Sequence, residues 1–319
     1  MKRLAPALLA ALLALPAAAQ NYPAKSVKIV VPAQPGGGLD LIGRTVAEQL
    51  TRSLEQSFFV ENVSGGGGAI ACQTVARAAP DGYTLMVGYV ATHGTNPAVR
   101  KVPYDPVKDF TAIAMVGGTR NMLVVQPAVP ASDLKGFVEY AKKKNGGLKY
   151  GSGGIGTLNH LIMEQFKAAA GFDMVVAHYR GIGPAFTDLL GGQLEAMTPG
   201  VAAALPHVRA KKVKPIAVTG HGRHPLLPDV PTFEEAGYRN FDAVQWYGIV
   251  GPAKMPADVT RKLHDAITQA VTAPALQQRL ASEAIDPMPM SSEEFGAYIQ
   301  SEVKRWSAVA RERGIHLDE

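Results

Sequence analysis

The sequence predicts an α/β fold arranged in two lobes. Short runs of β-branched and apolar residues alternate with glycine-rich turns and amphipathic helical segments. This alternation is typical of largely parallel strands connected by helices. About 300 residues follow a leader segment, and a chain of that length usually divides between two hydrophobic cores.

The leader has the features of a secretory signal peptide over residues 1–19. A basic stretch (Lys2, Arg3) precedes an apolar run over 4–15 that is too short to span a bilayer, and an A-x-A cleavage site follows at 17–19. An uncleaved membrane anchor is the alternative. We therefore expect an exported protein.

Charge and cysteine content exclude several classes of partner and of fold. Removing Lys2 and Arg3 lowers the formal charge from +5 to +3, and the remaining basic residues are dispersed. Neither nucleic acid nor a membrane surface is therefore an expected partner. Cys72 is the only cysteine, so no internal disulfide can form. Its apolar helical context predicts a buried structural thiol.

Five segments repeat the order strand, glycine turn and helix. In the first, Val27–Val31 predicts a strand, and apolar residues at helical spacing follow the turn (Leu39, Ile42, Val46, Leu50). The other four occupy residues 58–78, 83–99, 148–167 and 174–193.

Two further helical regions carry clear end signals. The Ser-Asp pair at 132–133 predicts a helix start, and Asn145 with the following glycine ends that helix after three lysines. The tail from Pro256 is helical and amphipathic. Within it, Ser291 and Glu294 form a predicted capping box.

The glycines at 151–156 (GSGGIG) have the spacing of a dinucleotide-binding turn. Such a site also needs an acidic residue about 20 positions later, at the end of the next strand. That strand ends in His178, Tyr179 and Arg180, whereas Asp173 precedes it. Arg180 leaves a 2′-phosphate site formally open, but export and the mid-chain position argue against a nucleotide. We expect no cofactor.

Other catalytic signatures are missing from the sequence. It contains no P-loop, no H-E-x-x-H and no G-x-S-x-G around Ser152. His221 and His224 lie in a Pro/Arg-rich segment that predicts a solvated loop, and no histidine cluster has metal-ligand spacing. His93 and His160 lie beside glycine turns. Either could serve as a base in an exported enzyme, but neither has a nucleophile or paired carboxylate in the sequence pattern.

Four glycine turns instead predict an anion-binding cleft. They precede helix starts at Gly36–Asp40, Gly65–Gly68, Gly153–Thr157 and Gly181–Pro184. A helix N-terminus carries unpaired N–H groups and a positive partial charge, and glycine lets a ligand approach the backbone closely. The alternative is that each turn only connects a strand to a helix.

A series of motifs makes the chain from Tyr22 to Ile315 similar to the periplasmic solute receptors of tripartite tricarboxylate transporters, the Bug receptors. The motifs occur in order along the chain: VPAQPGGGLD, VENVSGGGGAI, ARAAPDGYTLMVG, YDPVKDF, GSGGIGTLNHL, HYRGIGPAFTDLLGGQ, LPHVRAKKVKPIAVTG, LPDVPTFEEAG and WYGIVGPAKMP.

The resemblance implies a two-lobed Venus-flytrap fold of the type II periplasmic binding protein class. The first lobe would comprise residues 20–121 with 246–319, and the second 122–245. Crossing segments near Arg120–Val124 and Val244–Val250 would join them. We expect a periplasmic monomer that docks transiently on the membrane subunits of a transporter.

Carried over by motif position, the resemblance implies a set of ligand contacts. In the first lobe these are Ala33, Gln34, Gly38, Asp40, Thr92 and His93. In the second they are Ser152, Gly154, Thr157, His160, Tyr179, Gly181 and Pro184. Asp40 could instead cap its helix, and His160 and Tyr179 could pack behind the ligand.

Two departures from the family pattern bear on the ligand. The pair Ala33-Gln34 replaces a bulky residue followed by a small one, which implies a roomier pocket with an added polar side chain. Pro199 stands where amino-acid-binding members tend to carry an acid, so a ligand ammonium would lack its counter-charge. We expect a small carboxylate without an amine, either aromatic or a dicarboxylate.

The resulting functional hypothesis is a receptor that holds this carboxylate in the cleft by backbone amides and delivers it to a transporter. One alternative is a flytrap subunit that senses ligand for a signalling partner. The other is the exported enzyme using His93 or His160. We expect no catalytic residues and no metal site.

Overall fold

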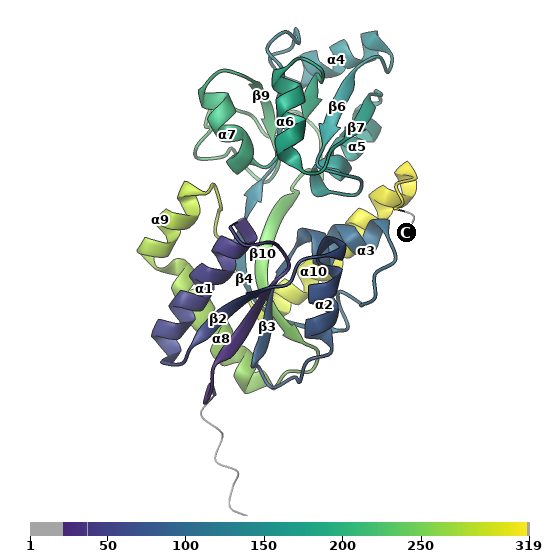
Figure 1. Cartoon of the computed structure of the whole chain (residues 1–319). Helices are drawn as coiled ribbons and strands as arrows, with labels where there is room; N and C mark the ends of the chain where they lie inside the picture. Colours follow the sequence, from purple (N-terminus) through teal and green to yellow (C-terminus); the bar gives the residue numbers. More distant parts are fainter. Residues whose placement is uncertain (1–21, 37, 318–319) are drawn as a thin grey trace, which may run out of the picture.

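Each lobe of the computed structural model is a five-stranded sheet flanked by helices (Figure 1). The structure describes residues 22–36 and 38–317, so the predicted signal peptide at 1–19 lies outside it. Within the described residues, no helix is both long enough and apolar enough to cross a membrane.

The first lobe is built on a sheet with strand order β2-β1-β3-β10-β4. Its strands are β1 (Val27–Val31), β2 (Phe58–Asn62), β3 (Thr84–Tyr89), β4 (Phe110–Arg120) and β10 (Val244–Pro252). The helical elements are α1 (Gly38–Leu54), η1 (Gly66–Gly68), α2 (Ala69–Ala76), η2 (Ala91–Thr95), α3 (Asn96–Val99), α8 (Ala257–Thr272), α9 (Pro274–Ser282) and α10 (Ser292–Arg313).

The second lobe is formed by the central part of the chain, with strand order β7-β6-β8-β5-β9. Its strands are β5 (Met122–Val125), β6 (Lys149–Ser152), β7 (Val175–His178), β8 (Ala196–Met197) and β9 (Lys214–Val218). Its helices are α4 (Leu134–Lys144), α5 (Leu158–Ala170), α6 (Ile182–Leu190) and α7 (Val201–Arg209).

The predicted α/β class is confirmed, but the sheets are mixed rather than largely parallel. Four strand pairings are parallel and four antiparallel. The antiparallel pairings all involve β5 or β10, the strands that follow the two passages between the lobes. Each of these two strands is therefore antiparallel to the neighbours with which it pairs.

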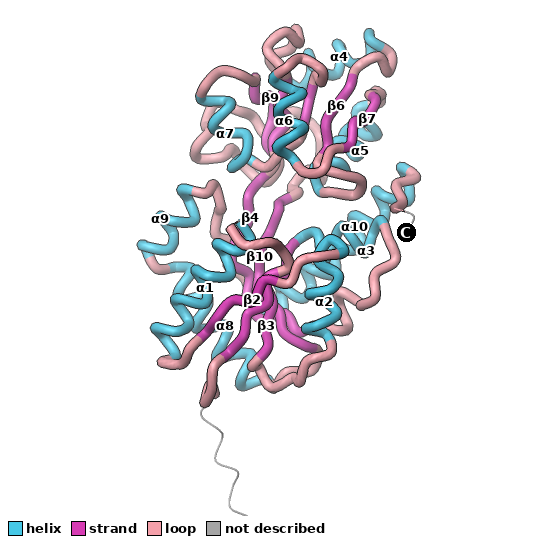
Figure 2. The backbone as a smooth tube through the Cα atoms, viewed as in Figure 1, coloured by secondary structure: helices cyan, strands magenta, loops and turns pink. Residues whose placement is uncertain are grey.

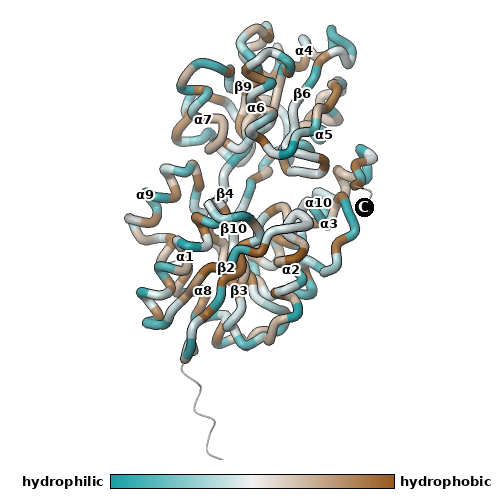
Figure 3. Tube along the Cα trace, viewed as in Figure 1, coloured by the Kyte–Doolittle hydropathy of each residue, from teal (hydrophilic) through white to brown (hydrophobic). Residues whose placement is uncertain are grey.

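Each lobe has its own apolar interior, as the hydrophobic strand segments in Figure 3 indicate. In the first lobe, strand β1 is buried between α1 and α8 on one side and α2 on the other. Cys72 on α2 is fully buried, as the sequence predicted. Burial raises the pKa of its thiol to about 12, so it is unreactive near neutral pH.

Two chain passages connect the lobes (Figure 2). The first runs from β4 through Asn121 into β5, and the second returns at the start of β10. The two passages are hydrogen-bonded to each other, because β10 pairs with β4 along its whole length, from Val244 opposite Arg120 to Pro252 opposite Phe110.

Helix α10 of the first lobe also contacts the second lobe. Apolar residues of α5 (Leu158, Leu161, Ile162) belong to the same buried cluster as Ile299 and Val309 on α10. At the end of α10, the Arg313 guanidinium donates to the buried Glu164 carboxylate on α5 at 3.0 Å.

The capping box predicted at the start of α10 is present. The Ser291 hydroxyl accepts from the Glu294 amide, and the Glu294 carboxylate accepts from the Ser291 amide at 2.8 Å. We expect Ser291→Ala to lower the free energy of unfolding by about 1 kcal/mol, because the first turn loses this acceptor. Urea unfolding measures the change.

Ser301→Ala is the matched control, since Ser301 is exposed within the same helix. We expect that change to be neutral or slightly stabilising, because alanine has the higher helix propensity. Equal losses in the two variants would contradict a specific capping role.

Candidate functional site

Three helix N-termini meet at one edge of the second-lobe sheet. Strands β7, β6 and β8 are adjacent and parallel, and they lead into α6, α5 and α7 respectively. The carboxyl ends of parallel strands share one sheet edge, so the helices that follow them begin side by side.

None of these three helices has a side-chain cap hydrogen bond or an acidic residue in its first turn, within the part of the chain that the structure describes. Their cap residues are Thr157, Gly181 and Gly200. Each N-terminus carries about half a positive elementary charge, so the three together more than offset the single negative charge of a carboxylate.

A cavity of about 310 Å³ lies at these helix starts. It is lined by residues of the three helix starts and of the two crossing strands: Thr119, Asn121, Gly153, Thr157, Leu158, Asn159, Gly181, Ile182, Gly200, Ala202, Ala203, Gln245 and Tyr247. No charged side chain is among these described lining residues. The electrostatics of the cavity therefore come from backbone dipoles and neutral polar groups.

The floor of the cavity is one face of the paired crossing strands. Thr119 lies opposite Gln245 in the β4–β10 ladder, and Tyr247 follows two residues later on the same strand face. The alternate residues point to the other side, where Arg120 and Val244 line a separate hollow with Asp286. Strand pleating thus gives the crossing ribbon a cleft face and a rear face.

The predicted loop residues of the second lobe divide between the cavity wall and its support. Thr157 and Gly181 line the cavity. Ser152 is fully buried, and its hydroxyl lies 2.7 Å from His178 Nδ1. Gly154, at φ +137°, accepts from the Thr157 hydroxyl at 2.7 Å. This bond directs the Thr157 side chain toward the loop rather than toward the amides of its own helix.

The remaining second-lobe candidates lie outside the cavity lining. His160 Nδ1 accepts from the Gly156 amide at 3.1 Å, and the Tyr179 hydroxyl donates to Asp188 at 2.6 Å. Pro184 is exposed in the first turn of α6. Pro199 is buried, and its carbonyl accepts from the Met122 amide at 2.9 Å. The proline at position 199 therefore places no charged side chain there.

In the first lobe, Asp40 has a well-defined structural role. Its carboxylate accepts from the Gly36 amide, Arg44 Nε and Asn62 Nδ2, all at 2.9 Å. These contacts, the one with Arg44 foremost, lower the pKa of Asp40 to about 2. Asp40 thus lies inside the first turn of α1 and holds the preceding turn through the Gly36 amide, whereas an N-cap side chain accepts from the amides of the helix that follows it.

The other first-lobe candidates form two groups. Gln34 is exposed on the segment before α1 and Gly38 is exposed as the first residue of that helix. Gln34 donates to the Ser64 hydroxyl at 2.7 Å, and the Ala33 carbonyl accepts from Asn62. Thr92 and His93 are fully buried in η2. None of the described first-lobe candidates lines the 310 Å³ cavity.

The histidines considered as bases are buried and uncharged. Burial lowers the pKa of His93 to about 3, and burial followed by repulsion from His178 lowers that of His160 to about 4. His224 was predicted to lie in a solvated loop, but only 1% of this residue is exposed, so that prediction is wrong. Leu227 and Val230, which follow it in the same loop, belong to one buried cluster with Ala284, two residues after the end of α9.

The sequence analysis missed the polar residues of the crossing strands. Thr119 and Asn121, like Gln245 and Tyr247, are polar residues two apart on strands that are otherwise largely apolar. This alternation was a readable signal for a polar strand face. This signal could not reveal that the two strands pair with each other, so that their polar faces lie side by side.

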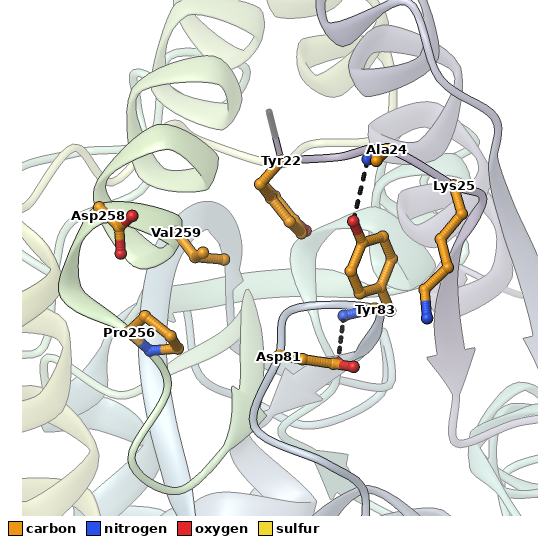
Figure 4. A pocket seen from close by; sticks show the side chains of 8 residues that line it. All are labelled: Tyr22, Ala24, Lys25, Asp81, Tyr83, Pro256, Asp258 and Val259. Carbon is orange, nitrogen blue, oxygen red and sulfur yellow. Dashed lines mark hydrogen bonds between the residues drawn. The ribbon is translucent and has the colours of Figure 1, made fainter. Parts of the chain in front are cut away.

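A second hollow, of about 600 Å³, lies at the far end of the first lobe (Figure 4). Several of its polar groups have partners close by. The Tyr22 hydroxyl donates to the Gly82 carbonyl, the Tyr83 hydroxyl accepts from the Ala24 amide, and Lys25 Nζ lies 4.3 Å from the Tyr83 ring centre. This hollow lacks the convergent helix starts of the cleft cavity, so we place the candidate site in the cleft.

The low histidine pKa values predict how stability depends on pH. Folded His160 excludes a proton that the unfolded chain binds below about pH 6.5, so the free energy of unfolding falls as the pH is lowered toward 4. We expect the loss between pH 7.5 and 5 to be about 2 kcal/mol smaller in His160→Asn than in the unmodified protein.

Urea unfolding at the two pH values provides the measurement, and His221→Asn is the control because His221 is exposed. An unchanged pH dependence in His160→Asn would show that folding does not lower the pKa of this imidazole.

Comparisons with known proteins give consistent matches. The family model described as tripartite tricarboxylate transporter family receptor matches residues 42–315. Protein BugT of Bordetella pertussis is 30% identical over 308 residues, which cover 96% of this chain and 94% of BugT.

Solved structures with the same architecture include two ligand complexes. An R. palustris protein with adipate has a TM-score of 0.80 at 30% identity, covering 92% of this chain and 99% of that one. MatC from Rhodopseudomonas palustris with bound malate has a TM-score of 0.75 at 31% identity, covering 90% and 99%. The chain therefore belongs to the tripartite tricarboxylate transporter receptor family, as its motifs predicted.

Proposed function

We propose that this protein is a periplasmic receptor that captures a small carboxylate at the three helix starts of its second lobe and delivers it to a tripartite transporter. The observation that carries the proposal is the convergence of the N-termini of α5, α6 and α7, none capped by a side chain among the described residues, on one cavity. Convergent amide donors and helix dipoles favour an anion.

The ligand is a carboxylate without an amine. An ammonium group in this cavity would need a carboxylate or several acceptors to replace its hydration, and the described lining residues include no acid. The buried Pro199, two residues before α7, adds no counter-charge there. Aromatic acids and dicarboxylates both remain within this class, and the relatives bound to adipate and malate support it.

Closure of the first lobe over the cavity completes the proposed site. In this proposal, Ala33 and Gln34 before α1 and Gly38 at its start approach the ligand from the opposite side, while Asp40 fixes the helix start behind them. Thr92 and His93 shape the wall from within the core, because both are fully buried.

Catalysis is a weaker alternative for the same cleft. His93 has no exposed surface, and His160 Nδ1 is occupied by the Gly156 amide. The cavity lining therefore offers no described side chain that titrates near neutral pH. A sensing role for a signalling partner uses the same binding chemistry, and the choice of partner would distinguish it from transport.

Ligand binding should stabilise the protein by mass action. In a thermal-shift screen, we expect adipate, malate or benzoate to raise the melting temperature, whereas the neutral amides of the same acids and the amino acids glutamate and aspartate leave it unchanged. Stabilisation by a neutral amide but by none of the acids would contradict the anion site.

A charge placed at the start of α7 tests the site directly. Ala202 lines the cavity at the second position of this helix. We expect Ala202→Asp to bind the best acid of the screen at least about tenfold more weakly than Ala202→Asn, because the two side chains have similar size and only one repels a carboxylate. Isothermal titration calorimetry compares them.

The melting temperatures of the two variants provide the control. An acidic residue in the first helical turn is favourable for the helix, so Ala202→Asp should melt no lower than Ala202→Asn. Equal affinities for the acid in two equally stable variants would exclude α7 from the binding site.

A further inference from the structure

One residue that lines the cleft cavity has a buried acceptor that lacks a hydrogen-bond partner among the described residues. Asn121, which connects β4 to β5, is only 2% exposed and lines the cavity. Its Oδ1 atom is buried without a partner among the described residues. An acceptor left in this state costs about 1–3 kcal/mol, so the position calls for a donor.

All the other polar atoms of Asn121 are engaged. Its amide donates to the Thr219 hydroxyl at 2.9 Å, and its carbonyl accepts from the Thr219 amide at 2.8 Å. Nδ2 donates to the Thr198 carbonyl at 2.8 Å. Because that carbonyl can only accept, the amide group of Asn121 is oriented with Nδ2 toward Thr198, which identifies Oδ1 as the free acceptor.

The neighbouring strand adds a complementary donor to the same wall. Gln245 Nε2 donates to the Tyr247 hydroxyl oxygen at 2.7 Å, and both residues line the cavity. That bond leaves the Tyr247 hydroxyl proton available for another acceptor. Burial raises the pKa of Tyr247 to about 12, so the proton is retained at neutral pH.

A ligand hydroxyl matches both groups, because it donates one hydrogen bond and accepts others. We infer that the cleft selects a hydroxycarboxylic acid, with its carboxylate at the helix starts and its hydroxyl donating to Asn121 Oδ1 beside the Tyr247 hydroxyl. This inference rests on the proposed carboxylate-binding function and names its substrate class. Asn121 is then the residue that determines specificity.

An ammonium substituent is a poorer occupant than a hydroxyl. It brings three donors and a full charge to a wall whose described residues offer neutral acceptors and no acid. A bare methylene leaves Asn121 Oδ1 without a partner. Hydrogen, hydroxyl and ammonium at one carbon therefore give three distinct affinities.

Two series of matched acids test the inference by titration calorimetry on the mature protein. Succinate, malate and aspartate differ only at carbon 2, as do propionate, lactate and alanine. We expect the hydroxy acid of at least one series to bind about tenfold or more tightly than its unsubstituted acid, and the amino acid to bind most weakly.

The substitution Asn121→Ala isolates the residue. We expect it to reduce the ratio of hydroxy-acid to plain-acid affinity to within about threefold of one, because only the hydroxyl has lost its acceptor. If the variant does not fold, as judged by its melting curve, the affinity ratios of the unmodified protein still decide the question.

The outcomes separate the two claims. Equal or tighter binding of the unsubstituted acids, or tightest binding of the amino acids, overturns the hydroxy-acid inference while leaving an anion site in place. Retention of the hydroxyl preference in folded Asn121→Ala overturns the role of this residue. If none of the acids binds but neutral solutes do, the proposed function itself fails.

Discussion

The hydrogen-bonded pairing of β4 with β10 is the constraint on which the arrangement of the cleft depends. Both chain passages between the lobes run through this ladder, so the position of one passage fixes that of the other. Pleating then assigns alternate residues to opposite sides. Thr119, Gln245 and Tyr247 reach the cleft, while Arg120 and Val244 turn to the rear.

The second lobe meets this ribbon with backbone rather than with charged side chains. Parallel strands β7, β6 and β8 deliver three helix starts to the same edge. A cleft lined by lysine or arginine would carry a large desolvation cost in its closed form. Partial charges fixed in a folded backbone need no counter-ion and little reorganisation to face an anion.

Local signals in the sequence predicted much of the fold. Strand β1 has the predicted bounds, and the capping box of α10 forms as its spacing indicated. Both depend on neighbours a few residues away. The mixed sheets were not predicted, because the direction of β10 depends on a return passage more than a hundred residues after β4.

The cavity was less accessible to sequence reasoning for the same reason. Thr157 and Gly181 were found because helix starts have local signatures. Asn121 and Tyr247 become neighbours of the cavity only through strand pairing. His224 is buried in a loop whose apolar residues share a cluster with Ala284, sixty residues later in the chain. Long-range packing decides burial, and periodicity read along a single sequence does not reveal which distant segments pack together.

The contact between α5 and α10 has a thermodynamic consequence. Leu158, Leu161 and Ile162 are buried in a cluster shared by both lobes. A rotation of the lobes must either pivot on this contact or expose these side chains to water, and newly hydrated apolar surface raises the heat capacity. The heat-capacity change of ligand binding therefore distinguishes a motion that pivots on the α5–α10 contact from one that separates these two helices.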